Sequence, residues 1–186
     1  MDQTRRSIII SLIGLVVVIG LAVLAALLIP FRVNEGATVQ DFTGVIERIT
    51  PDDERTQYEA SLTSAEVDLA TGERLVVHPG STAALTFFEN GGRANMTGPG
   101  TLTLVEVHRR ATLPGHASDN FNRDYVLTLK QKGGSVHYYF SDTEPAFDDI
   151  DITLHLPNGN YTPDTPCWLV EISDEGVTTT LPFECP

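Results

Sequence analysis

An uncharged apolar segment near the N-terminus constrains this chain more than any other feature. Residues 8–29 read IIISLIGLVVVIGLAVLAALLI, and 16 of these 22 residues are Leu, Ile or Val. As an α-helix the segment would be about 33 Å long, enough to cross a hydrocarbon core of about 30 Å. It contains none of the charged residues that oppose insertion at the centre of a bilayer. The sequence therefore predicts a transmembrane helix over residues 8–29.

The flanks of this segment predict its orientation. Arg5 and Arg6 precede it and only Arg32 follows closely, and basic residues favour the cytoplasmic side. We therefore expect the bulk of the chain outside the cytoplasmic membrane. The expected parts are a cytoplasmic tail (1–7), the membrane helix (8–29), a linker (30–37) and one periplasmic or extracellular domain (38–186). A cleaved signal peptide is the alternative, although its apolar run is usually about 7–15 residues.

The charge of the exterior part limits its partners. Beyond Arg32 the chain has 24 acidic and nine basic residues, a formal charge of −15, against −13 for the whole chain. Such a field repels nucleic acid and anionic headgroups, and acidity often serves solubility alone. We expect no nucleic-acid partner. The expected partners are membrane lipid, through residues 8–29, and other membrane or exterior proteins.

Short alternating segments dominate the rest of the chain. Period-two apolar spacing separated by Gly, Pro and Asn is typical of an all-β domain. The predicted strands are residues 75–77, 83–87, 102–104, 126–129, 136–140, 150–156, 168–172 and 177–183. An earlier strand over 38–49 is expected to break at Gly44. The predicted fold is mainly β, a sandwich or a short solenoid-like domain behind one N-terminal helix.

Connections between these strands carry three further predictions. Asp52 is a candidate cap for a short helix that ends near residue 62, with a loop as the alternative. Asn90-Gly91 and Gly133-Gly134 are tight-turn signals. The loop expected over 108–122 carries Arg109, Arg110 and His116, which are read as a concentration of basic character in the exterior part.

The two cysteines, Cys167 and Cys185, flank the last predicted hairpin. Folding this hairpin about residues 173–176 brings them close to facing positions, the separation that a disulfide needs. The predicted bridge suits an oxidising exterior compartment. Two unpaired buried thiols are the alternative.

A search for chemistry finds no catalytic or cofactor-binding motif. We expect no enzyme, no cofactor and no metal site. The histidines His78, His108, His116, His137 and His155 are scattered, and strand alternation predicts each as a single surface or edge residue. The acidic residues at 148–151 are read as the solvated start of a strand, with a calcium site as the alternative. The aromatic residues near 138–147 are read as core, with a recognition groove as the alternative.

One stretch resembles a known family. Gly80-Ser81 before an alternating strand, then Asn90-Gly91 at a tight turn, then Thr101-Leu102 resembles the FecR domain. This domain is the exterior sensory module of single-span regulators of iron uptake, and it also occurs in proteins without an iron role. The resemblance covers residues 66–177 and implies an exterior β-domain.

The classical FecR regulators also have an interior domain that binds a sigma factor. Residues 1–7 are too few to fold in that way, so we expect a FecR-like chain that lacks the cytoplasmic sigma-regulatory domain. The expected function is a non-catalytic, membrane-anchored binding or sensory module. The alternative is a single-span accessory structural subunit of a larger bacterial membrane complex.

Overall fold

The computed structural model describes residues 15–21, 23, 31–60, 66–88, 91–111, 125–141, 145–173 and 175–185. The chain divides into two units, Met1–Val33 with Arg110–Asn122 and Asn34–Arg109 with Arg123–Pro186. Residues 15–21 and 23 are helical. Within the described residues, no helix has both the length and the apolar composition needed to cross a membrane. The other residues of the predicted membrane segment lie outside the described ones, so the transmembrane helix stays a prediction.

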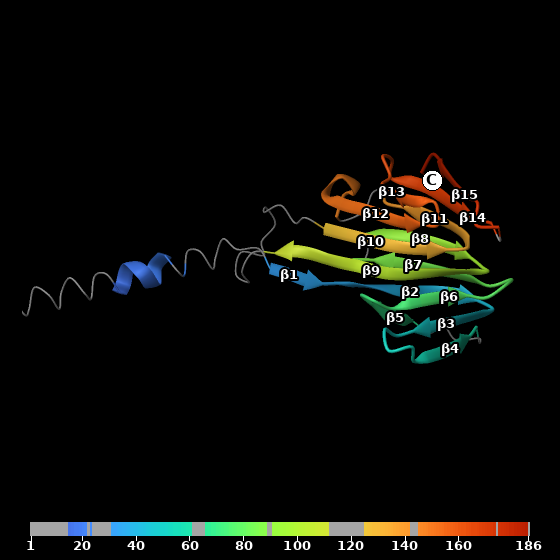
Figure 1. Ribbon diagram of the computed structural model, residues 1–186, viewed down its shortest axis with the longest axis horizontal. Helices are drawn as coiled ribbons and strands as arrows, with labels where there is room; N and C mark the ends of the chain where they lie inside the picture. Colours follow the sequence, from blue (N-terminus) through green and yellow to red (C-terminus); the bar gives the residue numbers. More distant parts are fainter. Residues whose placement is uncertain are drawn as a thin grey trace, which may run out of the picture. The chain divides into compact units, whose positions relative to one another are not determined.

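The strands form two sheets (Figure 1). Sheet A has the order β13 (Gly159–Tyr161), β12 (Ile150–Leu156), β10 (Tyr125–Lys132), β9 (Gly100–Ala111), β6 (Arg74–Val77), β3 (Val45–Ile49) and β4 (Arg55–Glu59), and β1 (Phe31–Asn34) also pairs with β9. Sheet B has the order β15 (Thr178–Pro182), β14 (Cys167–Ile172), β11 (Gly134–Tyr139), β8 (Gly92–Thr97), β7 (Thr82–Phe87), β2 (Gly36–Thr43) and β5 (Val67–Ala70). A 3₁₀ helix, η1 (Phe147–Asp149), precedes β12.

One hydrophobic core lies between the two sheets, because alternate residues of each strand point inward. In β10 every second residue from Tyr125 to Gln131 is buried. Trp168 of β14 is fully buried, and its ring stacks on Tyr138 and Phe140 at centroid distances of 5.0 and 5.4 Å. These two aromatic residues therefore belong to the core, and the mainly β fold is confirmed.

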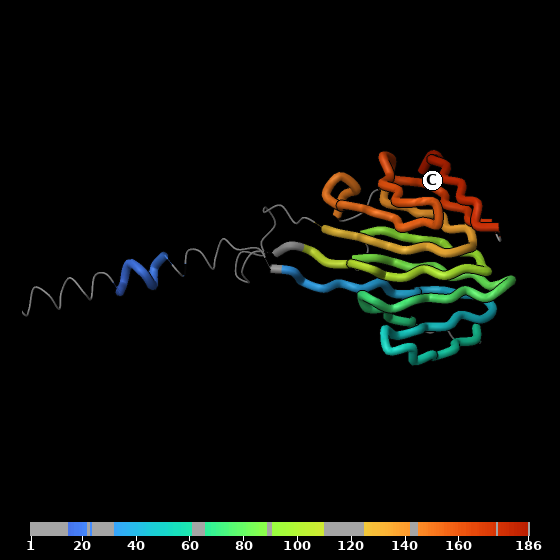
Figure 2. Tube along the Cα trace, in the orientation of Figure 1, coloured from blue at the N-terminus to red at the C-terminus, as the bar shows by residue number. Residues whose placement is uncertain are grey.

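Three of the corners at which the chain crosses from one sheet to the other hold a glycine at the same end of the sandwich, and the course of the chain can be followed in Figure 2. Gly44 joins β2 to β3, Gly80 lies between β6 and β7, and Gly133 joins β10 to β11. Their φ angles are 71°, 74° and 73°, in the region that glycine adopts most readily. The register pairs Thr43–Thr82, Thr82–Thr97 and Thr97–Ser135 align the corners. We call this end of the sandwich the glycine end.

The chain enters the second unit at the opposite end. The N–H of Glu35 donates to the carbonyl of Val107, late in β9. Thr101, early in β9, pairs instead with Lys132 at the last residue of β10. Thr101 and Val107 are six residues apart in β9, which corresponds to about 20 Å at about 3.3 Å per residue. The glycine end is therefore about that far from the point of entry.

The structure corrects two predictions about connections. The helix predicted from Asp52 is wrong over the described residues, because residues 55–59 form β4, which pairs with β3. Asp53 has a φ of 61°, outside the helical region, and its N–H donates to the carbonyl of Thr50 in a turn. The loop predicted from residue 108 is also wrong at its start, because β9 continues to Ala111. The predicted linker, residues 30–37, contains β1 and the start of β2.

Candidate functional site

The residues behind the FecR resemblance have structural roles. Ser81 is buried after the Gly80 corner, and its Oγ accepts a hydrogen bond from the N–H of Val45 at 2.8 Å. This bond joins the β6–β7 corner to the β2–β3 corner.

The other residues of this pattern lie in the β7–β8 turn and in β9. The N–H of Gly91 donates to the carbonyl of Phe87 at 2.8 Å. Leu102 of β9 belongs to the core, and its neighbour Thr101 is half-buried. Asn90 lies outside the described residues. The FecR-like pattern therefore indicates turns and strands of the fold rather than a ligand site.

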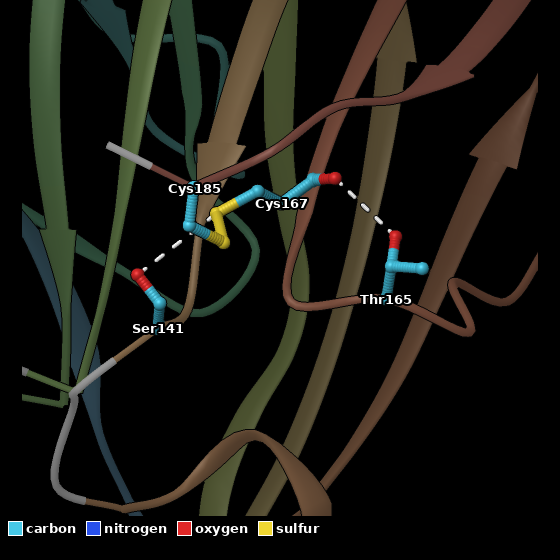
Figure 3. The surroundings of a disulfide bond; sticks show 4 residues. All are labelled: Ser141, Thr165, Cys167 and Cys185. Carbon is cyan, nitrogen blue, oxygen red and sulfur yellow. Dashed lines mark hydrogen bonds between the residues drawn. A yellow bond between two sulfur atoms is a disulfide. The ribbon is translucent and has the colours of Figure 1, made fainter.

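The predicted disulfide is confirmed (Figure 3). The sulfur atoms of Cys167 and Cys185 are bonded, and their Cα atoms are 5.5 Å apart. The hydroxyl of Thr165 donates to the carbonyl of Cys167 at 3.3 Å, and the Oγ of Ser141 lies 4.0 Å from its sulfur. The bridge ties the segment after β15 to the start of β14.

An aromatic cluster on the outer face of sheet B lies beside this bridge. The ring of Phe183 is 5.4 Å from the ring of Tyr139 and 5.8 Å from that of His137, centroid to centroid. The neighbouring Leu181 has half of its surface exposed. Tyr139 was predicted as core or as part of a recognition groove, but alternation along β11 directs it outward. We call these four residues the outer patch.

A partly buried ion pair holds the β5–β6 turn against β3. Arg48 donates to Glu73 through Nε at 2.9 Å and through Nη2 at 2.6 Å, and the N–H of Ala70 donates to the same carboxylate at 2.9 Å. Burial raises the pKa of Glu73, but these hydrogen bonds and the Arg48 charge outweigh it, so the pKa lies below its ordinary value. The same pairing raises the pKa of Arg48. The pair stabilises the fold.

A buried amide connects the two sheets near the glycine end. The side chain of Gln131 is fully buried, and its Nε2 donates to the carbonyls of Gly134 and Val170 at 3.3 Å each. Its Oε1 accepts the hydroxyl of Tyr138 at 3.2 Å. Burial raises the pKa of Tyr138 far above its ordinary value, so this hydroxyl stays a donor. Both ends of the amide are therefore fixed.

An open groove of about 500 Å³ lies at the glycine end, above this amide. Three turns surround it: the Gly133 corner, the β12–β13 turn and the β14–β15 turn. Its lining residues are Lys130, Gln131, Lys132, Gly133, His155, Leu156, Pro157, Ile172, Ser173 and Gly176. Turns gathered at one end of a sandwich on a rigid scaffold are frequent sites of binding. The groove is therefore the candidate functional site.

The groove differs in charge from the rest of the chain. Lys130 and Lys132 are the only two lysines in the sequence, and both line the groove and are exposed. His155 lies opposite Lys130 in the register of β12 with β10. Its Nδ1 is 2.7 Å from the Oδ1 of Asn160. No Asp or Glu is among the described residues that line the groove.

The sequence prediction did not identify these lysines. The available signal was their position: two lysines two residues apart in one predicted strand point to the same face. The sequence indicated a concentration of basic residues over 108–122 instead, and residues 112–122 lie outside the described ones.

The histidines follow the prediction in part. His78, His137 and His155 are half-buried, and His116 lies outside the described residues. His108 is only 2% exposed, so its prediction as a surface or edge residue is wrong. It lies within β9, opposite Val126 of β10, rather than in a loop.

The structure also bears on the acidic residues at 148–151. Asp148 and Asp149 are exposed in η1, and Asp151 is exposed at the start of β12, which agrees with a solvated strand start. Across the residues that the structure describes, no group of three or more His, Cys, Asp or Glu could hold a metal ion.

Comparisons of the chain with protein-family models, with curated proteins and with solved structures find no match. The fold and the groove thus define only a broad class, a mainly β protein with two sheets and an open groove at one end. The FecR resemblance stays a prediction.

Proposed function

We propose that this chain is a non-catalytic binding module of FecR-like type, held outside the cytoplasmic membrane by residues 8–29, and that it binds its ligand in the groove at the glycine end. The observation that carries the proposal is the groove itself, a volume of about 500 Å³ within the usual range for ligand sites of roughly 300–1,000 Å³. It lies at the end of the sandwich opposite to the entry of the chain.

Two further observations support the exterior, membrane-anchored part of the proposal. The disulfide between Cys167 and Cys185 is of a kind that persists in oxidising compartments. The large side chains of residues 15–19, 21 and 23 are all apolar and 53–63% exposed. Such a surface is unfavourable in water, and lipid would cover it.

Site-specific photocrosslinking in the native membrane tests the binding site. A photoreactive residue in place of Ser173, at the groove, is compared with one in place of Gln57, exposed on β4. We expect one defined crosslinked product at Ser173 and none at Gln57. Equal products at both positions, or none at Ser173, would contradict a binding site in the groove.

A structural accessory subunit is the second candidate function, and the outer patch favours it. Phe183, Tyr139 and the half-exposed Leu181 present apolar surface beside the disulfide, suited to a permanent neighbour. Purification in a mild detergent distinguishes the two functions. A fixed set of membrane proteins at constant stoichiometry supports the subunit, whereas recovery of the chain alone supports the binding module.

A further inference from the structure

We infer that the groove at the glycine end binds a small organic anion, with its phosphate or carboxylate group held by Lys130 and Lys132 and its apolar part against Leu156, Pro157 and Ile172. This inference rests on the proposed binding function and adds the chemical class of the ligand.

The first observation that favours an anionic ligand is the distribution of charge along the chain. The exterior part has 24 acidic and nine basic residues, so the lysines and histidine of this lining stand out from the surface around them. Lys130 and Lys132 are two residues apart in β10, which separates their Cα atoms by about 7 Å on one face. Ammonium groups on flexible stems can converge from that separation on one oxyanion.

His155 adds a polar neighbour to Lys130. The Oδ1 of Asn160 can only accept, so the Nδ1 of His155 carries the proton in their 2.7 Å contact. In the neutral ring Nε2 is then an acceptor, so it can receive a hydrogen bond from the Lys130 ammonium rather than donate one to the anion. Lys130 is its register neighbour, and the two side chains lie on the same face of sheet A.

Two described carboxylates, those of Glu171 and Glu175, stand next to lining residues in the sequence. Glu171 lies on the outer face of sheet B, in register with Ser135 and Thr179. Glu175 is exposed in the β14–β15 turn, next to the lining residue Gly176. We expect its carboxylate to weaken anion binding. Removing this charge should therefore strengthen binding, whereas removing the lysine charges should weaken it.

The apolar lining favours an anion with an organic part over a bare inorganic one. Leu156 and Ile172 are buried core residues at the ends of β12 and β14, and Pro157 is exposed beside them. Gln131 also belongs to the lining, but its hydrogen bonds are already made, whereas Lys130 and Lys132 are exposed on the other face of β10. The anionic group of the ligand would therefore contact the lysines, and its apolar part would contact the apolar lining of the same groove.

Calorimetric titration of the full chain in a non-ionic detergent tests the inference. The probes are phenyl phosphate and benzoate, with phenol as the neutral control and inorganic phosphate as the control without an apolar part. The test variant is Lys130→Gln/Lys132→Gln. The matched control is Arg55→Gln/Arg93→Gln, which removes two exposed cations from β4 and β8.

We expect one molecule of phenyl phosphate or benzoate per chain, bound more tightly than phenol or inorganic phosphate. The lysine double variant should weaken this binding roughly tenfold, the arginine double variant less than about twofold, and Glu175→Gln should strengthen it. Equal weakening by both double variants would show unspecific charge attraction and overturn the inference, as would the absence of binding by both anionic probes.

The two proposals fail differently. If Ser173 still gives its crosslinked product while neither anionic probe binds, the groove is a binding site and only the ligand class is wrong. If Ser173 gives no product and the probes do not bind either, the proposed function fails with the inference.

Discussion

At the scale of single residues, the ion pair between Arg48 and Glu73 should be a main contributor to stability. Glu73→Gln removes a charge that receives three hydrogen bonds, and hydrogen bonds to charged groups contribute about 1.5–3 kcal/mol each. Because Arg48 keeps about a third of its side chain exposed, we expect a loss of only about 2 kcal/mol in the free energy of unfolding. Urea denaturation at neutral pH measures it, with the exposed Glu54→Gln as a near-neutral control.

The same pair gives the expected pH dependence. The pKa of Glu73 in the folded protein lies below its ordinary value of 4.5, so its contribution is complete above pH 4.5 and is lost as the pH falls through the folded pKa. The difference in unfolding free energy between the wild type and Glu73→Gln should therefore shrink only below about pH 4.5. A difference that is constant down to the acid limit of folding would contradict the assignment.

Alanine substitutions at two glycines distinguish the cost of backbone strain from the cost of steric crowding. Gly44 and Gly80 both have positive φ, but a Cβ at Gly44 would clash with the Oγ of Ser81, whereas one at Gly80 would meet nothing within 4 Å. Gly80→Ala should cost about 1–2 kcal/mol from backbone strain alone. Gly44→Ala should cost at least about 1 kcal/mol more, because it displaces the hydroxyl that binds the N–H of Val45. Thermal denaturation compares the two, and equal costs would refute the role of Ser81.

At the scale of elements, the disulfide should hold β15 in place. The bridge closes a loop with a sequence separation of 18, which is worth about 3 kcal/mol in the chain-entropy model. Cys167→Ala/Cys185→Ala should lower the free energy of unfolding by about that amount and speed hydrogen exchange in residues 178–182. Exchange in β10 should change less, because β10 has β9 and β12 on its two sides.

Reduction of the wild type provides the check on this prediction. The reduced protein should match the double alanine variant in stability and in exchange over β15. If the variant and the wild type exchange alike in this strand, the bridge does not support it.

The sequence predicted those elements whose apolar spacing is regular. The strands over 150–156 and 168–172 and the interruption at Gly44 follow directly from alternation and from one glycine. β4 was missed because its five residues read RTQYE, without an apolar alternation. What makes it a strand is its pairing with β3 and the left-handed turn at Asp53, and neither is visible in local sequence.

At the scale of the whole molecule, the candidate site was the least predictable part. Its lining comes from β10, from the end of β12 and from the β14–β15 turn, which only the folded register brings together. β10 and β12 pair in parallel, so their last residues lie at the same end. Pattern reading along the chain predicted each strand but not this parallel pairing, and hence not the meeting of Lys132 with His155 and Ile172 around one groove.

The attachment of the whole chain to the membrane is the last prediction. Val17→Arg/Leu21→Arg puts two charges into the segment 8–29, where each costs about 2.5–3.5 kcal/mol at the centre of a bilayer. After alkaline carbonate extraction, the wild type should stay in the membrane pellet and this variant should not. The control is Val105→Arg, which adds a charge at a residue of β9 with 40% exposure, and it should behave as the wild type. Retention of the double arginine variant would mean that other contacts hold the chain to the membrane, and release of the wild type would refute the anchor.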